Sequence, residues 1–155
     1  MENKVILLVE DNADDEELTL RALKLNHVLN KVIVVHDGEE ALEYLYGAGK
    51  SPAQFITDLP QVMLLDLKLP KLSGLDVLKQ VRADPRTELL PVVILTSSNE
   101  DEDILSCYRS GANSYVRKPV EFERFADAVK QLGCYWLLVN QFPPIALSQS
   151  NQTEE

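Results

Sequence analysis

Short runs of apolar residues alternate with longer stretches of helical periodicity along most of this chain. The short runs are rich in Val, Ile and Leu, as is typical of strands buried on both faces of a parallel sheet. Five runs are expected to be strands: Val5–Val9, Lys31–Val35, Val62–Leu65, Val92–Thr96 and Ser114–Arg117. The alternation predicts an α/β fold in which five parallel strands form one doubly wound (βα)5 sheet with helices on both faces.

The segments between these strands carry apolar residues at helical spacing. The first helix is expected to begin near Asp14, where acids suit an N-terminus, and the fourth to span residues 102–110 and end at Gly111. The last helix is expected to run from about residue 121 towards residue 139. Residues 47–58 contain Gly, Lys, Ser and Pro and are predicted to form an exposed loop. The apolar residues at helical spacing are Leu18, Ala22, Leu25 and Leu29 on one face of the first helix, Ala41, Leu42 and Leu45 facing inward in the second, Leu75, Leu78 and Val81 in the third, and Phe125, Val129, Leu132 and Trp136 in the last.

The length of 155 residues and the hydrophobic content of 45% suit a single domain with a continuous core. We assign residues 1–142 to this domain. Residues 143–155 begin with two prolines, and residues 148–155 are polar and without apolar periodicity. The segment 143–155 is therefore expected to form a flexible tail. No output domain is expected in the remainder.

The net charge of −10 disfavours nonspecific attraction to nucleic acid or anionic membrane, which would need a basic face. No apolar run approaches the ~20 residues of a membrane span, and the start of the chain lacks a signal-peptide pattern. We therefore expect a cytoplasmic protein with proteins or small ions as partners. The two cysteines lack metal-motif spacing and are interpreted as reduced, structural thiols.

Acidic residues follow two of the predicted strands at the same relative place. Glu10 and Asp11 come directly after the first strand, and Asp66 comes directly after the third. Neighbouring parallel strands would bring these carboxylates together at one edge of the sheet, where α/β proteins commonly bind ligands. Three converging carboxylates repel one another unless a metal ion or a lysine neutralises them, and Lys118 is the expected lysine.

The chemistry of such a site depends on whether Asp66 is a metal ligand or a nucleophile. A carboxylate nucleophile can form an aspartyl phosphate when nearby cations neutralise charge on the phosphoryl group. Mg2+ suits this chemistry because it prefers oxygen ligands and retains waters. Thr96 ends the fourth strand and could bond a phosphoryl oxygen, and Lys118 could approach as a point charge. Their occurrence at consecutive strand ends favours one joint site over unrelated solvated residues.

Five short segments carry these residues: 9–12 (Val-Glu-Asp-Asn), 65–67 (Leu-Asp-Leu), 69–70 (Leu-Pro), 95–97 (Leu-Thr-Ser) and 118–119 (Lys-Pro). Asp66 and Thr96 are 30 positions apart, and Thr96 and Lys118 are 22 apart. In these motifs and in this spacing the chain resembles the response-regulator receiver domain of two-component signalling. The resemblance covers roughly residues 5–139 and implies the flavodoxin-like receiver fold.

The resemblance implies a role for each residue at the acidic edge. It makes Asp66 the phosphoacceptor and Lys118 the residue that holds the phosphoryl group. It also implies a bound Mg2+ whose ligands are Glu10, Asp11, Asp66 and the backbone carbonyl of Lys68.

The resemblance further implies a conformational switch. Thr96 and Tyr115 would form the switch pair, in which the hydroxyl moves towards the phosphate and the aromatic ring rotates inward. That movement would change the face made by the fourth helix, the fifth strand and the fifth helix. The peptide bond between Lys118 and Pro119 is commonly cis in family members, since proline lowers the cis penalty.

The segment between the acidic pair and Asp66 is longer than in minimal receivers, and residues 47–58 account for the excess. Together with the aromatic run at 134–138, this length resembles the stand-alone cyanobacterial phytochrome response regulators. This narrower resemblance implies that a phytochrome-like sensor histidine kinase donates the phosphoryl group. Because no output domain is expected, the altered face would change pairing with another protein or return information to the kinase.

Two other functions fit parts of the pattern. An aspartate-nucleophile phosphatase also uses a strand-end Asp and Mg2+, but Lys68 stands where its general acid would be. A phosphorylation-independent interaction module would use Phe122, Tyr135 and Trp136 as a dimer surface, although such residues more often fill a core. A surface that exposes Trp136 with Leu137 or Leu138 would favour association, so we expect the protein to form a homodimer. We favour a receiver that signals, and not an enzyme that turns over a small substrate.

Overall fold

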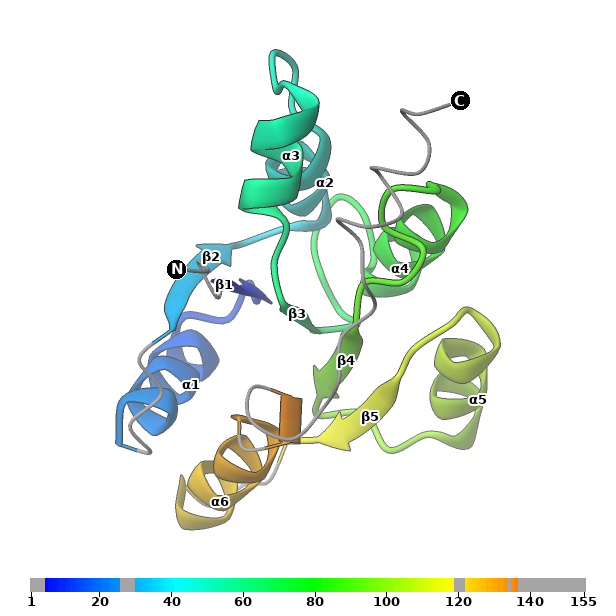
Figure 1. The fold of residues 1–155 in the computed structure, drawn as a ribbon. Helices are drawn as coiled ribbons and strands as arrows, with labels where there is room; N and C mark the ends of the chain where they lie inside the picture. The colour runs from blue at the N-terminus through cyan, green and yellow to red at the C-terminus, as the bar shows by residue number, and fades with distance from the viewer. Residues whose placement is uncertain (1–4, 26–29, 119–121, 134, 137–155) are drawn as a thin grey trace.

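In the computed structural model, five parallel strands form one sheet in the order β2-β1-β3-β4-β5 (Figure 1). The structure describes residues 5–25, 30–118, 122–133 and 135–136. The strands are β1 Val5–Val9, β2 Lys31–Val35, β3 Val62–Leu65, β4 Val92–Thr96 and β5 Ser114–Arg117. The sequence predicted these bounds and the parallel, doubly wound sheet, and the structure confirms both.

Helices cover both faces of the sheet because successive side chains of each strand point to opposite faces. The helices are α1 Ala13–Leu25, α2 Gly38–Tyr46, α3 Pro52–Asp58, α4 Gly74–Ala83, α5 Asp101–Arg109 and α6 Phe122–Gly133. In β1, Leu7 and Val9 pack in the core cluster shared with α2, α4 and α5. Ile6 and Leu8 pack in the cluster shared with α1 and α6. Figure 1 shows these two helical layers on either side of the sheet.

Residues 47–58 do not form the continuous loop that their composition predicted, because α3 occupies the second half of the segment. The hydroxyl of Ser51 accepts a hydrogen bond of 3.1 Å from the backbone N–H of Gln54, and Pro52 takes the first helical position. Both are favourable helix starts. Phe55 is buried and stacks on Tyr46 with ring centroids 6.4 Å apart. The loop prediction was wrong because it weighed composition above these local signals.

The buried face of α1 also differs from the prediction. The helix buries Thr19, Ala22 and Leu23, whereas Leu25 is exposed at its last position. Leu25 is the last residue of the helix and lies at the flank of the buried face, about 60° around the helix from Ala22 and about 200° from Leu23. Ala22 is therefore confirmed as a core residue, and Leu25 is not one.

The aromatic end of the chain is divided between core and surface. Trp136 is only 7% exposed and packs in the cluster with α1 and α6, so the expected surface exposing it to a second copy is wrong. Its large apolar area is stabilising in the core. Tyr135 is half exposed and meets the Trp136 ring edge-on. The side chain of Phe122, the isomer of the 118–119 peptide and the predicted tail at 143–155 lie outside the described residues.

No helix in the described ranges is long and apolar enough to span a bilayer.

Arg82 ties α4 to the loops at the amino ends of β4 and β5. Its guanidinium donates hydrogen bonds to the carbonyls of Gly111 (2.9 Å) and Leu90 (2.7 Å) and to the Asn113 side-chain oxygen (2.9 Å). Gly111 has a φ of 102°, as its predicted place after α5 requires, and an added Cβ would lie 2.8 Å from Arg82 Nε. One side chain thus satisfies backbone carbonyls that the strand ladders leave open.

We expect Arg82→Met to lower the free energy of unfolding by about 2–4 kcal/mol, because it removes the donor to the carbonyls of Gly111 and Leu90. Urea unfolding measures this loss. Lys79→Met is the matched control, since Lys79 is an exposed cation on the same helix, and it should change stability by less than about 0.5 kcal/mol. Equal effects of the two substitutions would contradict this role of Arg82.

Cys107 is a structural thiol by its environment. Its side chain is buried in the core cluster, and burial raises the pKa of the thiol to about 11. At pH 8 almost none of it is thiolate, the reactive form. In a Cys134→Ser variant, Cys107 should react with a chromogenic disulfide reagent only after urea unfolds the protein. Reaction of the folded variant at the unfolded rate would contradict the buried placement.

Candidate functional site

The carboxyl ends of β1 and β3 place Glu10 and Asp66 next to each other. The strands pair in register with Val9 opposite Leu65, so the residue after each lies at the same edge of the sheet. The backbone N–H of Asp66 donates to the Val9 carbonyl at 3.1 Å, which continues the ladder past the strand ends. The register therefore brings Glu10 and Asp66, which are far apart in the sequence, to neighbouring positions at one edge of the sheet.

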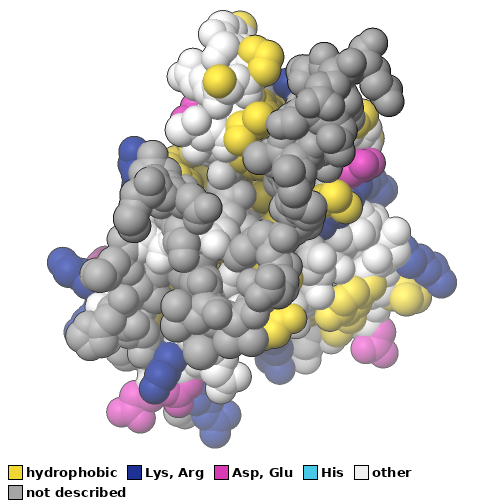
Figure 2. Space-filling model, in the orientation of Figure 1, with side chains coloured by type: hydrophobic (Ala, Val, Ile, Leu, Met, Phe, Trp, Pro, Cys, Tyr) yellow, Lys and Arg dark blue, Asp and Glu magenta, His cyan; other side chains and the backbone are white. Residues whose placement is uncertain are grey.

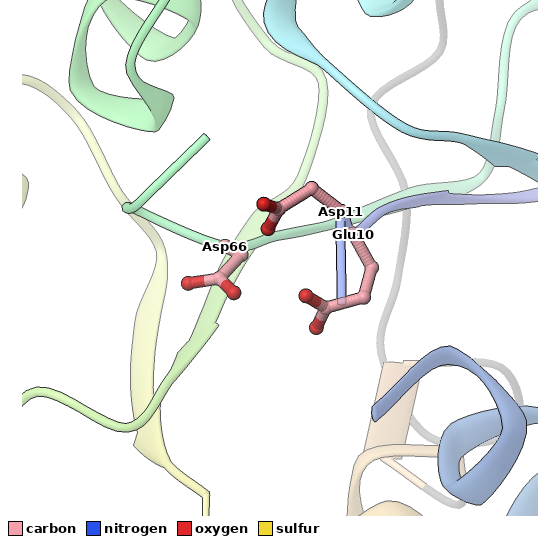
Figure 3. A group of neighbouring side chains, drawn as sticks. All are labelled: Glu10, Asp11 and Asp66. Carbon is pink, nitrogen blue, oxygen red and sulfur yellow. The ribbon is translucent and has the colours of Figure 1, made fainter. Parts of the chain in front are cut away.

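Three carboxylates converge at this edge (Figure 3). One oxygen from each of Glu10, Asp11 and Asp66 lies within 4.8 Å of the others. Glu10 and Asp66 are buried, whereas Asp11 is exposed beside an open depression that Asp66, Lys68 and Ser97 also line. Oxygen ligands grouped on one side and open to water on the other suit a hard divalent cation. The donor set thus fits a metal ion.

Lys118 supplies positive charge to the same group from the end of β5. Its Nζ contacts Glu10 Oε1 and lies 3.0 Å from Asp66 Oδ2 and 3.0 Å from Asp15 Oδ2. The Lys118 side chain is only 5% exposed. Its backbone N–H donates to the Thr96 carbonyl at 2.7 Å, which fixes the lysine to the end of β4. The predicted neutralising lysine is therefore at the acidic edge.

Burial and charge shift the pKa values of Glu10 and Lys118 in opposite directions. Burial raises the pKa of Glu10 to about 7, against the lowering effect of its hydrogen bond with Lys118. For Lys118, burial alone would lower the pKa, but the hydrogen bond with Glu10 and the charge of Asp66 outweigh it and raise the pKa above its ordinary value. The lysine thus stays a cation near neutral pH, and the buried acids hold it there.

Thr96 and Tyr115, the predicted switch pair, are linked through Ser98. The Thr96 hydroxyl is fully buried and accepts a weak hydrogen bond of 3.5 Å from the Ser98 N–H. The Tyr115 hydroxyl donates to the Ser98 carbonyl at 2.8 Å. The Ser98 side chain in turn donates to Asp103 on α5 at 2.6 Å. A chain of hydrogen bonds therefore connects the end of β4 with β5 and α5.

The loop after β3 closes the site from the side of α4. The backbone N–H of Lys68 approaches Asp66 Oδ1 at 3.4 Å, while the Lys68 side chain is exposed. Gly74, the first residue of α4, donates its N–H to the Leu67 carbonyl at 2.9 Å. A Cβ on Gly74 would lie 2.0 Å from the Asp66 carbonyl oxygen, so only glycine allows this approach.

The structure brings Glu10, Asp11, Asp66 and Lys118 together, as the sequence predicted. Sequence reasoning missed Asp15. It counted this acid only as part of a favourable helix N-terminus, although its position shortly after the acidic pair was a usable signal. Sequence reasoning also missed Gly74, for which the glycine at the start of a predicted helix was the signal.

Comparison with known proteins places this arrangement in a family. Residues 6–130 match the model of the response regulator receiver domain. The chain is 39% identical over 142 residues to the probable methanogenesis regulatory protein FilR2 of Methanothrix harundinacea (strain 6Ac), with 90% of this chain and 87% of the relative covered.

Several solved structures share the fold. The phosphorylated cyanobacterial phytochrome response regulator RcpA is 35% identical with a TM-score of 0.80, covering 91% of this chain and 99% of that one. The Mn2+-bound response regulator Rcp1 is 32% identical with a TM-score of 0.80, covering 90% and 99%. The bacteriophytochrome response regulator AtBRR is 48% identical with a TM-score of 0.70, covering 91% and 100%.

Receiver domains are signalling proteins that bind a divalent metal and act with histidine kinases. The match spans most of the chain, and the acidic edge with its lysine lies at the carboxyl ends of the strands. The chain therefore belongs to the response regulator receiver domain family.

Proposed function

We propose that this protein accepts a phosphoryl group on Asp66 from a phosphohistidine of a sensor histidine kinase. The observation that carries the proposal is the placement of Asp66, a buried carboxylate 3.0 Å from the Lys118 ammonium and grouped with Glu10 and Asp11. Because a carboxylate is already deprotonated, it needs no general base to act as the nucleophile. Lys68 stands where an aspartate-nucleophile phosphatase has a second acid, so turnover of small phosphoesters is not favoured.

In the transfer, an Asp66 oxygen attacks phosphorus as the bond from phosphorus to the kinase imidazole nitrogen breaks. The imidazole leaves with the bonding electron pair and takes a proton from solvent. Lys118 faces the charge of the phosphoryl oxygens as a point charge. Glu10, Asp11, Asp66 and the Lys68 carbonyl would hold Mg2+, which neutralises charge on the transferring group when bound.

We infer that the signal leaves the site through Thr96, Ser98 and Tyr115. A phosphoryl group on Asp66 would draw the Thr96 hydroxyl towards it, which alters the hydrogen bonds around Ser98 and so the position of the Tyr115 ring. The face affected is α5–β5–α6, which corresponds to the fourth helix, fifth strand and fifth helix of the sequence prediction because α3 adds one helix.

This face has apolar residues available to a partner. Leu105 and Tyr108 are exposed on α5, and Figure 2 shows hydrophobic side chains gathered over this helix. Together with the half-exposed Tyr135, they support a protein recipient or a second copy of the chain as the target. The names of the similar structures RcpA and AtBRR support a phytochrome as the sensor kinase.

Phosphorylation is expected to require both Asp66 and Mg2+. Intact-protein mass after incubation with acetyl phosphate should show one added phosphoryl group in the wild type with Mg2+, and none with a chelator or in Asp66→Asn. Glu88→Gln is the matched control, because Glu88 is an exposed acid in the loop before β4, at the other end of the strands from the site, and it should be phosphorylated like the wild type. An adduct that survives Asp66→Asn would contradict the assignment.

Magnesium binding should depend on Asp11. Titration calorimetry should show that Asp11→Asn weakens Mg2+ binding about tenfold or more, because one of three grouped carboxylates is lost. Asp14→Asn removes an equal charge outside this group and should change the affinity much less. Identical affinities in wild type and Asp11→Asn would show that these acids do not hold the metal.

A further inference from the structure

One of the three carboxylate partners of Lys118 lies outside the group formed by Glu10, Asp11 and Asp66. Asp15 lies in the first turn of α1, and its Oδ2 is 3.0 Å from Lys118 Nζ. The Asp15 backbone N–H donates to the Asn12 side-chain oxygen at 2.9 Å, which places the residue beside the acidic edge. Asp15 is not one of the grouped carboxylates that suit a metal ion. Its contact with the lysine therefore calls for a separate explanation.

The lysine ammonium has three N–H donors and three carboxylate partners. Glu10, Asp15 and Asp66 each accept one hydrogen bond from Nζ, so every donor is in use. A phosphoryl group bound at Asp66 brings new oxygens that need a donor. For Lys118 to bind such an oxygen, it must release one of its present partners.

The three partners differ in what their release would cost. The Glu10 side chain is 1% exposed, so loss of the lysine would leave a buried carboxylate without its cation. Asp66 itself carries the incoming group. The Asp15 side chain is 34% exposed, so water can replace the lysine at this carboxylate. Asp15 is thus the partner that Lys118 can leave most easily.

We propose that Asp15 is a positioning residue that holds Lys118 in the unphosphorylated protein and competes with the phosphoryl group for it. The inference rests on the proposed function, because it takes Asp66 as the place where the phosphoryl group binds. The carboxylate of Asp15 holds the ammonium at the correct edge of the sheet before transfer. The same carboxylate then opposes binding of the phosphoryl group, both by occupying a donor and by its negative charge.

Removal of the Asp15 charge should therefore strengthen phosphoryl binding. The probe is beryllium trifluoride, a non-covalent phosphoryl mimic, and bound fluorine is observed directly by 19F NMR at saturating Mg2+. Asp15→Asn should bind the probe about two- to fivefold more tightly than the wild type, as expected for loss of a partly exposed ion pair. Asp14→Asn is the matched control, since it removes the same charge from the same helical turn without contact to Lys118.

The direction of the change in probe affinity distinguishes a positioning role of Asp15 from a purely structural one. If Asp15 only supported the fold, its substitution would weaken probe binding and lower the thermal midpoint. Asp15→Ala is the second variant and should also bind the probe more tightly than the wild type. Probe binding by Asp15→Asn that equals or falls below that of Asp14→Asn would overturn the inference while the proposed function stands. A wild type that binds no probe in saturating Mg2+ would overturn the proposed function, and the inference with it.

Discussion

The ammonium group of Lys118 is the constraint on which the whole carboxyl-terminal edge of the sheet depends. Glu10 and Asp66 lie side by side with little exposure, an arrangement that like charges would oppose without a cation. The lysine enters from β5 at the opposite side of the sheet from β2, so its ion pairs connect the first, third and fifth strands and α1. One buried cation thus couples elements that are more than 100 residues apart in sequence.

Backbone contacts in the rest of the fold fix the positions of these charged residues. Parallel pairing in register sets Asp66 beside Glu10, and the backbone hydrogen bond from Lys118 to Thr96 aligns the lysine with the same edge. Gly74 lets α4 begin directly against the Asp66 backbone, so the loop that carries Lys68 stays short and close. The strands therefore place the acids and the lysine at one edge of the sheet, while loops line its opening to solvent, as in other α/β sites.

Much of this could be predicted from the sequence, and the reasons for success and failure are physical. The strands were predictable because buried parallel strands are continuous runs of Val, Ile and Leu. Glu10, Asp66 and Lys118 were predictable because a residue that directly follows a strand inherits the position of its end. Asp15 was not, since its contact with Lys118 depends on how α1 packs over the sheet. The helix α3 was missed although Ser51-Pro52 marks its start. The burial of Trp136 depends on tertiary packing, which helical spacing alone does not determine.

A double-mutant cycle on Lys118 and Asp66 tests the central claim most directly. The free energy of unfolding in urea would be measured at pH 8 without Mg2+ for the wild type, Lys118→Met, Asp66→Asn and the double variant. We expect Lys118→Met to cost about 3–5 kcal/mol, because it leaves buried carboxylates unpaired, and we expect Asp66→Asn to restore part of that loss. The coupling energy should exceed about 1 kcal/mol. Effects that add within about 0.5 kcal/mol would contradict the claim that this lysine holds the acidic edge together.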